Sequence, residues 1–182
     1  MSAEGAGPAE ADGMRALLVT GAVGVGKTTV ADAIGDELEE RGIPGAVLDL
    51  DWLRRSWPSP AGDRFNSRVE LANLRAVCAV YRGTGARVLV AAGVLEEVGA
   101  RADYEEAFGC PLTVVRLRAP RDLVRSRLRR RHERDPEALA WHLARFDELS
   151  AILEVARVED AAVDAAEDPR VSARRVLAAA RI

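Results

Sequence analysis

The chain has 182 residues, 48% of them hydrophobic, which suits a single α/β domain with a buried core. Its net charge of −3 gives no general attraction to nucleic acid or to an anionic membrane, so neither is expected as a partner. No apolar run is long enough to span a bilayer and the first residues lack a secretion signal, so a cytoplasmic location is expected. Residues 1–13, rich in Ala, Gly and Glu, are predicted to be a disordered tail.

A glycine-rich loop follows the first predicted strand, the short apolar run at residues 15–20. Residues 21–28 read Gly-Ala-Val-Gly-Val-Gly-Lys-Thr and fit the phosphate-binding pattern G-x-x-x-x-G-K-[ST]. An amphipathic helix is predicted next, from Thr28 to Arg41. Backbone N–H groups and a helix N-terminus hold phosphates in this arrangement, which predicts ATP as a ligand with Mg²⁺ on the Thr28 hydroxyl. The predicted nucleotide-binding residues are Gly21, Val23, Gly24, Val25, Gly26, Lys27, Thr28 and Thr29.

Lys27 is the only lysine among the 26 Lys and Arg residues of the chain. A base bias that replaces lysine with arginine has therefore spared this one position. A compact ammonium can bridge the β- and γ-phosphates within a tight loop, whereas a planar guanidinium has the wrong shape. We therefore predict that Lys27 acts in catalysis.

The rest of the chain alternates between predicted strands and helices. Strands are predicted at residues 45–50, 87–92, 112–117 and 161–164, and helices at 67–82, 121–131, 136–157 and 173–181. Ser172 is the predicted cap of the last helix, and Cys78 and Cys110 are interpreted as small buried residues without a disulfide. The alternation predicts an α/β fold in which helices cover both faces of a parallel sheet and ligands bind at the carboxyl ends of its strands.

Two carboxylates, Asp49 and Asp51, stand at the end of the second predicted strand. Residues i and i+2 share one face of an extended strand, which would turn both toward the phosphate loop. Asp49 is predicted to position Mg²⁺ and Asp51 to accept a proton from a substrate hydroxyl. The structural alternative is that Asp51 caps a short helix from Trp52 and that Asp49 is a solvated strand residue. The third strand ends at Gly93 without an acid, so the metal role falls to the pair.

Six arginines between residues 125 and 134 form the densest positive charge in the chain. They are Arg125, Arg127, Arg129, Arg130, Arg131 and Arg134. Arginines in a lid over the transferring phosphate neutralise charge in the transition state, and Arg127 is the predicted catalytic member. The alternative is a solvated basic helix face.

Aromatic and basic residues surround the acid pair and are candidates for acceptor binding. Trp52 and Trp57 are expected either to stack on an acceptor or to lie in the core, and Trp141 is expected in the core. A set of arginines nearby favours an anionic acceptor: Arg54, Arg55, Arg64, Arg68 and Arg75.

These motifs together resemble the small P-loop kinases, most closely adenylylsulfate kinase, over roughly residues 14–131. The family's Leu-Asp-Gly-Asp-Asn-x-Arg segment is similar to residues 48–54, and its Asn-Ile-Arg-Arg helix to Asn73-Leu74-Arg75. Its Ala-Pro pair, with an arginine seven residues further on, matches Ala119, Pro120 and Arg127. The resemblance implies a P-loop NTPase-type three-layer sandwich with a five-stranded parallel sheet, ATP with Mg²⁺, and phosphoryl transfer to a hydroxyl of a small molecule.

We further predict one kinase domain at residues 14–182, a lid near residues 127–137, and acceptor-binding roles for Asp51, Trp52, Arg54 and Asn73. Several positions depart from the adenylylsulfate kinase pattern: Leu50 replaces a glycine, Glu70 an arginine, and residues 93–95 an Ile-Ser-Pro segment. Antibiotic, gluconate and nucleotide kinases share this scaffold and stay open as alternatives, as does a regulatory nucleotide-binding protein without turnover. A homodimer also stays open.

Overall fold

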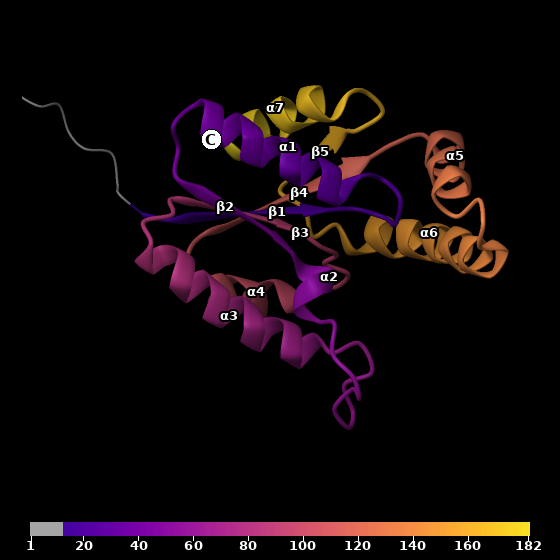
Figure 1. Cartoon of the computed structure of the whole chain (residues 1–182), viewed down its shortest axis with the longest axis horizontal. Helices are drawn as coiled ribbons and strands as arrows, with labels where there is room; N and C mark the ends of the chain where they lie inside the picture. Colours follow the sequence, from indigo (N-terminus) through magenta and orange to yellow (C-terminus); the bar gives the residue numbers. More distant parts are fainter. Residues whose placement is uncertain (1–12) are drawn as a thin grey trace, which may run out of the picture.

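Five parallel strands form one sheet in the computed structural model, which describes residues 13–182 (Figure 1). Their order across the sheet is β2-β3-β1-β4-β5. The strands are β1 (Arg15–Thr20), β2 (Gly45–Asp49), β3 (Val88–Ala92), β4 (Leu112–Arg118) and β5 (Ala161–Asp164). The helices are α1 (Lys27–Glu40), α2 (Leu50–Leu53), α3 (Ser67–Gly83), α4 (Ala100–Phe108), α5 (Arg121–Arg131), α6 (Pro136–Ala156) and α7 (Pro169–Ala180).

Helices cover both faces of the sheet, which confirms the predicted three-layer α/β fold. Helices α1 and α7 lie on one face and α3 and α4 on the other, while α5 and α6 extend from one end (Figure 1). The central strand β1 shows why both faces are apolar: Leu17 and Val19 are buried under α1 and α7, and Ala16 and Leu18 under α3 and α4. Parallel strands covered on both sides typically form nearly continuous apolar runs.

The predicted elements are recovered within one or two residues at most boundaries, with exceptions at three helices, α2, α4 and α7. Helix α4 was not predicted, because its sequence ARADYEEAF carries few apolar residues and buries only Tyr104, Ala107 and Phe108. The predicted cap of α7 was wrong: Asp168 accepts a hydrogen bond from the Arg170 N–H at 2.8 Å, and Ser172 is buried inside the helix. The predicted tail lies, apart from Gly13, outside the described residues.

The tryptophans lie at the surface, which corrects the prediction of a core role. Trp141 is 61% exposed because α6 packs through Phe146, Leu149 and Leu153, which lie on a different side of that helix. Trp52 and Trp57 are 68% and 82% exposed. Over the described range 13–182, none of the helices is long and apolar enough to cross a membrane.

Candidate active site

The loop between β1 and α1 leaves a helix N-terminus open toward the carboxyl edge of the sheet. Within residues 13–182 no side chain caps α1, whose N-cap is Gly26 with φ of 110°. The first N–H groups of a helix have no intrahelical partner and attract anions. At Gly24, φ is 79° and a Cβ would lie 2.8 Å from Leu128 Cδ2 of α5, so a side chain would displace this helix. The loop therefore needs glycine for its conformation and for the close approach of α5.

The ammonium of Lys27 lies at the mouth of this loop. Its Nζ donates a hydrogen bond to the Ala22 carbonyl at 3.4 Å, a long contact that leaves its other donors for a ligand. Burial lowers the pKa of Lys27 to about 8, and the carboxylates of Asp51 and Asp49 oppose this effect. A partly desolvated cation in this position is suited to pair with phosphate.

Thr28, Asp49 and Asp51 come together through direct hydrogen bonds. The Thr28 hydroxyl donates to Asp49 Oδ2 at 2.8 Å, and the Asp51 N–H donates to Asp49 Oδ1 at 2.9 Å. The predicted strand geometry is wrong, because β2 ends at Asp49 and α2 begins at Leu50. The cap of this short helix is Asp49, and Asp51 lies in its first turn. Both carboxylates nevertheless reach the pocket in front of the loop.

This pocket has a volume of about 730 Å³ and collects most of the predicted site residues. It is lined by Val23, Gly24, Val25, Gly26, Lys27, Thr28, Thr29, Val30, Asp49, Asp51, Trp52, Arg127, Leu128, Arg130, Arg131, Ala165, Glu167, Pro169 and Ser172. Gly21 is buried behind it, where a Cβ would lie 2.8 Å from the Leu117 carbonyl oxygen. Gly21 therefore shapes the loop without lining the pocket.

The arginines of residues 125–134 that lie in α5 fall into two groups, because their side chains leave this helix from different faces. Arg127, Arg130 and Arg131 are spaced i, i+3 and i+4, so they share the face that borders the pocket. Arg127 is already held: its guanidinium donates to the carbonyl oxygens of Val25 at 2.9 Å and Ala165 at 3.1 Å. Arg125 points elsewhere and pairs with Asp147 at 3.0 Å. The run is therefore partly a ligand-facing surface and partly structural.

The predicted lid segment, residues 127–137, spans the end of α5, a short connection and the start of α6. Leu128 anchors α5 in a cluster with Phe146, Leu149 and Leu153 of α6. The arginines beyond this anchor, Arg129, Arg130, Arg131 and Arg134, are exposed.

Binding of an ATP analogue with Mg²⁺ should protect the chain from trypsin after Arg130 and Arg131. These side chains are exposed and border the pocket, so phosphate contacts would order them. Limited proteolysis followed by mass spectrometry would measure the effect, with cleavage after Arg41, at the far end of α1, as the control that stays unchanged. Equal protection with and without the analogue would argue against a closing lid.

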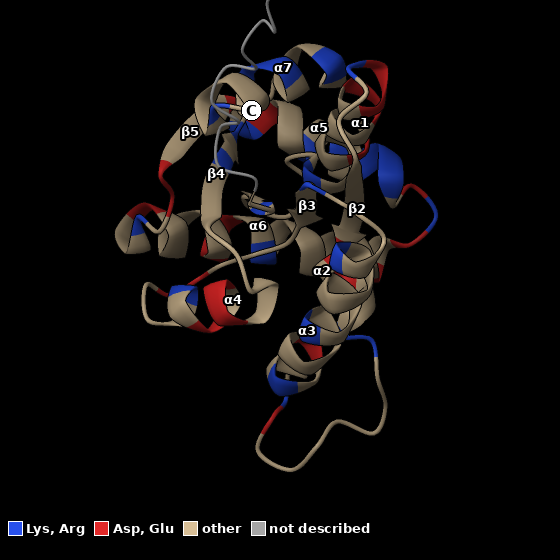
Figure 2. Ribbon diagram, turned by 90° about the vertical axis from the view of Figure 1, so that its left-hand side faces the viewer, with Lys and Arg blue, Asp and Glu red and all other residues tan. Residues whose placement is uncertain are grey.

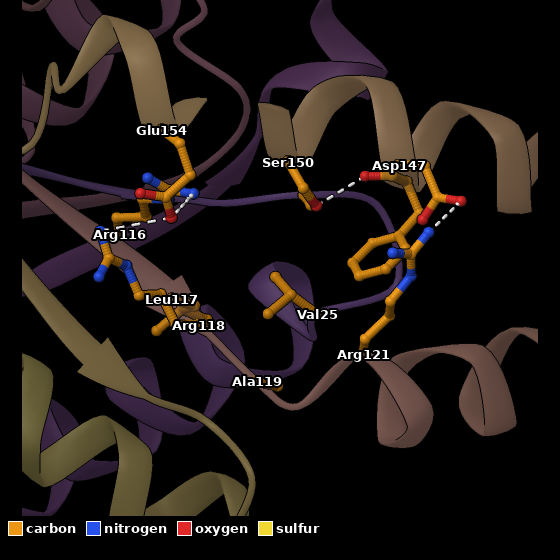
Figure 3. A pocket seen from close by; sticks show the side chains of 11 residues that line it. Val25, Arg116, Leu117, Arg118, Ala119, Arg121, Asp147, Ser150 and Glu154 are labelled. Carbon is orange, nitrogen blue, oxygen red and sulfur yellow. Dashed lines mark hydrogen bonds and ion pairs between the residues drawn. The ribbon is translucent and has the colours of Figure 1, made fainter. Parts of the chain in front are cut away.

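A second pocket, of about 320 Å³, lies behind the phosphate loop between β4, the start of α5 and α6 (Figure 3). Its arginines face carboxylates: Arg116 is 3.0 Å from Glu154, and Arg121 is 2.6 Å from Asp147. Such internal pairing satisfies the cations and leaves them poorly suited to a phosphate. The pocket in front of the loop is therefore the candidate active site.

Two predicted acceptor-binding residues have structural partners instead. The guanidinium of Arg54 pairs with the buried carboxylate of Glu70, and the Asn73 amide donates to the Leu53 carbonyl at 2.7 Å. Neither residue lines the pocket. These contacts could not be predicted from the sequence, because the partners belong to different elements.

Two of the departures from the adenylylsulfate kinase pattern compensate each other. Leu50 is fully buried, and a Cβ at Gly93 would lie 2.5 Å from Leu50 Cδ1. The missing side chain at Gly93 therefore makes room for the leucine that stands between the two aspartates.

The sheet order, the glycine-rich loop after the central strand and the Lys27–Thr28 pair define a P-loop nucleotide-binding fold. Residues 17–156 match the family model described as an AAA domain, and the chain belongs to this family. No curated protein sequence matches the chain.

Solved structures that share the fold include a gluconokinase, an APS kinase and a tunicamycin resistance protein. A gluconokinase from Sinorhizobium meliloti 1021 is 22% identical, with 93% of each chain covered and a TM-score of 0.59. A tunicamycin resistance protein from Deinococcus radiodurans is 18% identical, covering 91% of this chain and 94% of that chain, with a TM-score of 0.64. The APS kinase of Mycobacterium tuberculosis, in complex with AMPPNP and APS, is 20% identical, covering 94% and 100%, with a TM-score of 0.55. These likenesses confirm the predicted small-kinase fold.

Proposed function

We propose that the protein is an ATP-dependent kinase that transfers the γ-phosphoryl group to a hydroxyl of a small molecule. The observation that carries this proposal is the convergence of Lys27, the Thr28–Asp49 pair and Asp51 on one pocket. A protein that only binds nucleotide has no need of Asp51 beside the phosphate loop. Consumption of ATP with a panel of hydroxylated acceptors tests the proposal, and ATP binding without turnover of any acceptor would favour the regulatory alternative.

The two ends of the pocket suit the two ends of a nucleotide. The open N-terminus of α1 and Lys27 suit the phosphates, since both offer N–H donors and positive charge. The connection between β5 and α7 contributes Ala165 and Pro169, and Arg127 stands between the two regions. Apolar atoms beside a guanidinium suit the flat face of a base.

The chemistry would be an in-line displacement at the γ-phosphorus. The acceptor oxygen forms a bond to the γ-phosphorus while the bond between the γ-phosphorus and the β,γ-bridging oxygen breaks. ADP leaves with the electron pair of the broken bond. The acceptor proton passes to the Asp51 carboxylate. Lys27 and the exposed arginines Arg130 and Arg131 stabilise the negative charge on the transferring group.

Thr28 and Asp49 are the residues that would hold Mg²⁺. Their oxygens lie 2.8 Å apart beside the phosphate loop, and hydroxyl and carboxylate oxygens are ligands that this ion prefers. Bound there, the ion would neutralise charge on the β- and γ-phosphates.

Replacing Asp49 by asparagine should raise the Mg²⁺ concentration needed for half-maximal turnover by about 10–100-fold. The amide can still accept the hydrogen bond from Thr28 but has lost the charge that attracts the ion. A Mg²⁺ titration at saturating ATP would measure the shift, with Asp103→Asn on the exposed surface of α4 as a matched control. An unchanged Mg²⁺ requirement would remove Asp49 from the metal site.

The contacts of the arginines that follow the acid pair bear on the charge of the acceptor. The sequence favoured an anionic acceptor of the adenylylsulfate type, because five arginines follow the acid pair. Three of these five pair with carboxylates of the protein: Arg54 with Glu70, Arg68 with Asp63 and Arg75 with Glu106. The argument for an anion therefore loses three of its five arginines, and the antibiotic-type alternative gains weight over the adenylylsulfate and nucleotide kinase alternatives, whose acceptors are anions.

A further inference from the structure

The charge balance beside Asp51 depends on three linked side chains: the buried Glu70 of α3 and Tyr104 of α4, and the partly buried Arg54, which caps the C-terminus of α2. Glu70 of α3 is fully buried and binds the Arg54 guanidinium through one carboxylate oxygen. Its other oxygen accepts the hydroxyl hydrogen bond of Tyr104 on α4. Both oxygens of Glu70 are therefore engaged, and Arg54 has a strong internal partner of opposite charge.

Arg54 also lies close to the proposed base, because its Nε is 3.8 Å from Asp51 Oδ1. Asp51, Arg54 and Glu70 together carry one net negative charge. An anionic acceptor approaching Asp51 would meet this charge, whereas the arginine that the adenylylsulfate kinase pattern has at position 70 would have made the site positive. A like charge next to an anion disfavours its binding and selects against it.

The same side of the molecule presents aromatic side chains to solvent. Trp52 follows Asp51 and lines the pocket, and it is 68% exposed. The loop after α2, which projects from the body of the molecule (Figure 2), carries Trp57 and Phe65, both well exposed. The Asn66 amide anchors this loop by donating to the carbonyls of Arg54 and Ser56, each at 2.8 Å. The exposed ring of Trp52, which lines the pocket together with Asp51, provides a face on which an apolar or aromatic ligand can stack.

We propose that the acceptor is an uncharged hydroxyl compound with an aromatic or apolar body, selected by the buried Glu70 against anionic analogues. This inference rests on the kinase function proposed above and specifies its substrate class. The hydroxyl lies toward Asp51, where it loses its proton to the carboxylate as its oxygen bonds to the γ-phosphorus and ADP departs.

Matched pairs of hydroxyl compounds test the inference directly. A suitable panel contains p-hydroxymethylbenzamide with p-hydroxymethylbenzoate, and hydroxyphenylacetamide with hydroxyphenylacetate. The members of each pair differ in charge and share the hydroxyl. ADP release and product mass would be measured for each at saturating ATP·Mg²⁺, and the neutral members should have the higher kcat/KM.

Glu70→Gln should then raise kcat/KM for the charged members, relative to their neutral partners, by about tenfold. The glutamine can still bind Tyr104 but no longer neutralises Arg54. Two variants serve as controls that should keep the preference of the parent protein: Tyr104→Phe removes the hydroxyl without a change of charge, and Glu148→Gln removes an exposed carboxylate that pairs with Arg145 on α6.

The outcomes separate the two proposals. A higher kcat/KM for the anionic members, or a ratio that Glu70→Gln leaves unchanged, would overturn the uncharged acceptor while kinase activity stood. A panel without any phosphorylated member, although an ATP analogue binds, would overturn the kinase function and this inference with it. If Glu70→Gln does not fold, the ratio for the parent protein still decides.

Discussion

Replacing Lys27 by alanine should lower turnover by at least about 10²–10³-fold while the protein stays folded. The ammonium lies where the β- and γ-phosphates would be bound, and its loss removes charge stabilisation from the transferring group. The fold should tolerate the change, because the one hydrogen bond of Nζ, to the Ala22 carbonyl, is 3.4 Å long. Turnover, binding of a fluorescent ATP analogue and the thermal midpoint Tm would be measured together.

Lys27→Arg provides the matched control, because it keeps the charge and changes the shape. We expect it to be nearly as impaired as the alanine variant, since a planar guanidinium does not fit the loop. The mismatch of a guanidinium with the loop would explain why the single lysine of a chain otherwise rich in arginine stands at this position. Normal binding and turnover in Lys27→Ala would show that the loop does not hold phosphates.

The pH dependence of nucleotide binding gives an independent test of Lys27. Burial lowers its pKa to about 8, from 10.5 in solution. The group is charged below that pKa and neutral above it, so affinity for the anionic nucleotide should fall as the pH rises through about 8. The same step should be missing from the titration of Lys27→Ala.

The phosphate loop was predictable because its residues are contiguous and its pattern prescribes a local geometry. The link between Thr28 and Asp49 is less local, since 21 residues separate them. It followed from the rule that parallel strands end at one edge of the sheet. Both carboxylates line the pocket in front of the phosphate loop even though α2 begins one residue after Asp49 and the assumed strand face does not exist.

The acceptor side was not predictable in the same way. Arg54 pairs with Glu70, which is 16 residues further along the chain. Tyr104 lies another 34 residues beyond Glu70, on helix α4, which was not predicted from the sequence. The sequence does not show which charged residues pair with one another. It therefore predicts a ligand site from a set of arginines of which three pair with carboxylates of the protein. The exposure of Trp57 and Trp141 similarly reversed the average tendency of tryptophan to be buried.

Asp51→Asn should lower kcat by about 10²–10⁴-fold, the usual cost of losing a general base. Its carboxylate is well placed for the role: the side chain is 72% exposed, it lines the pocket, and its nearest basic partner, Arg54, is 3.8 Å away. The amide has a similar shape but cannot take a proton from the acceptor hydroxyl.

The affinity for ATP, unlike kcat, should not fall in Asp51→Asn. The carboxylate lies near Lys27 and the phosphates, so removing its charge should leave ATP affinity unchanged or slightly higher. A fall in kcat together with undiminished nucleotide binding would assign Asp51 to the acceptor half of the reaction. Added Mg²⁺ should restore turnover in Asp49→Asn but not in Asp51→Asn, because the ion cannot replace a missing general base. Small and equal effects in both variants would instead mean that the two aspartates only hold β2 and α2 together, as the hydrogen bond from the Asp51 N–H to Asp49 already does.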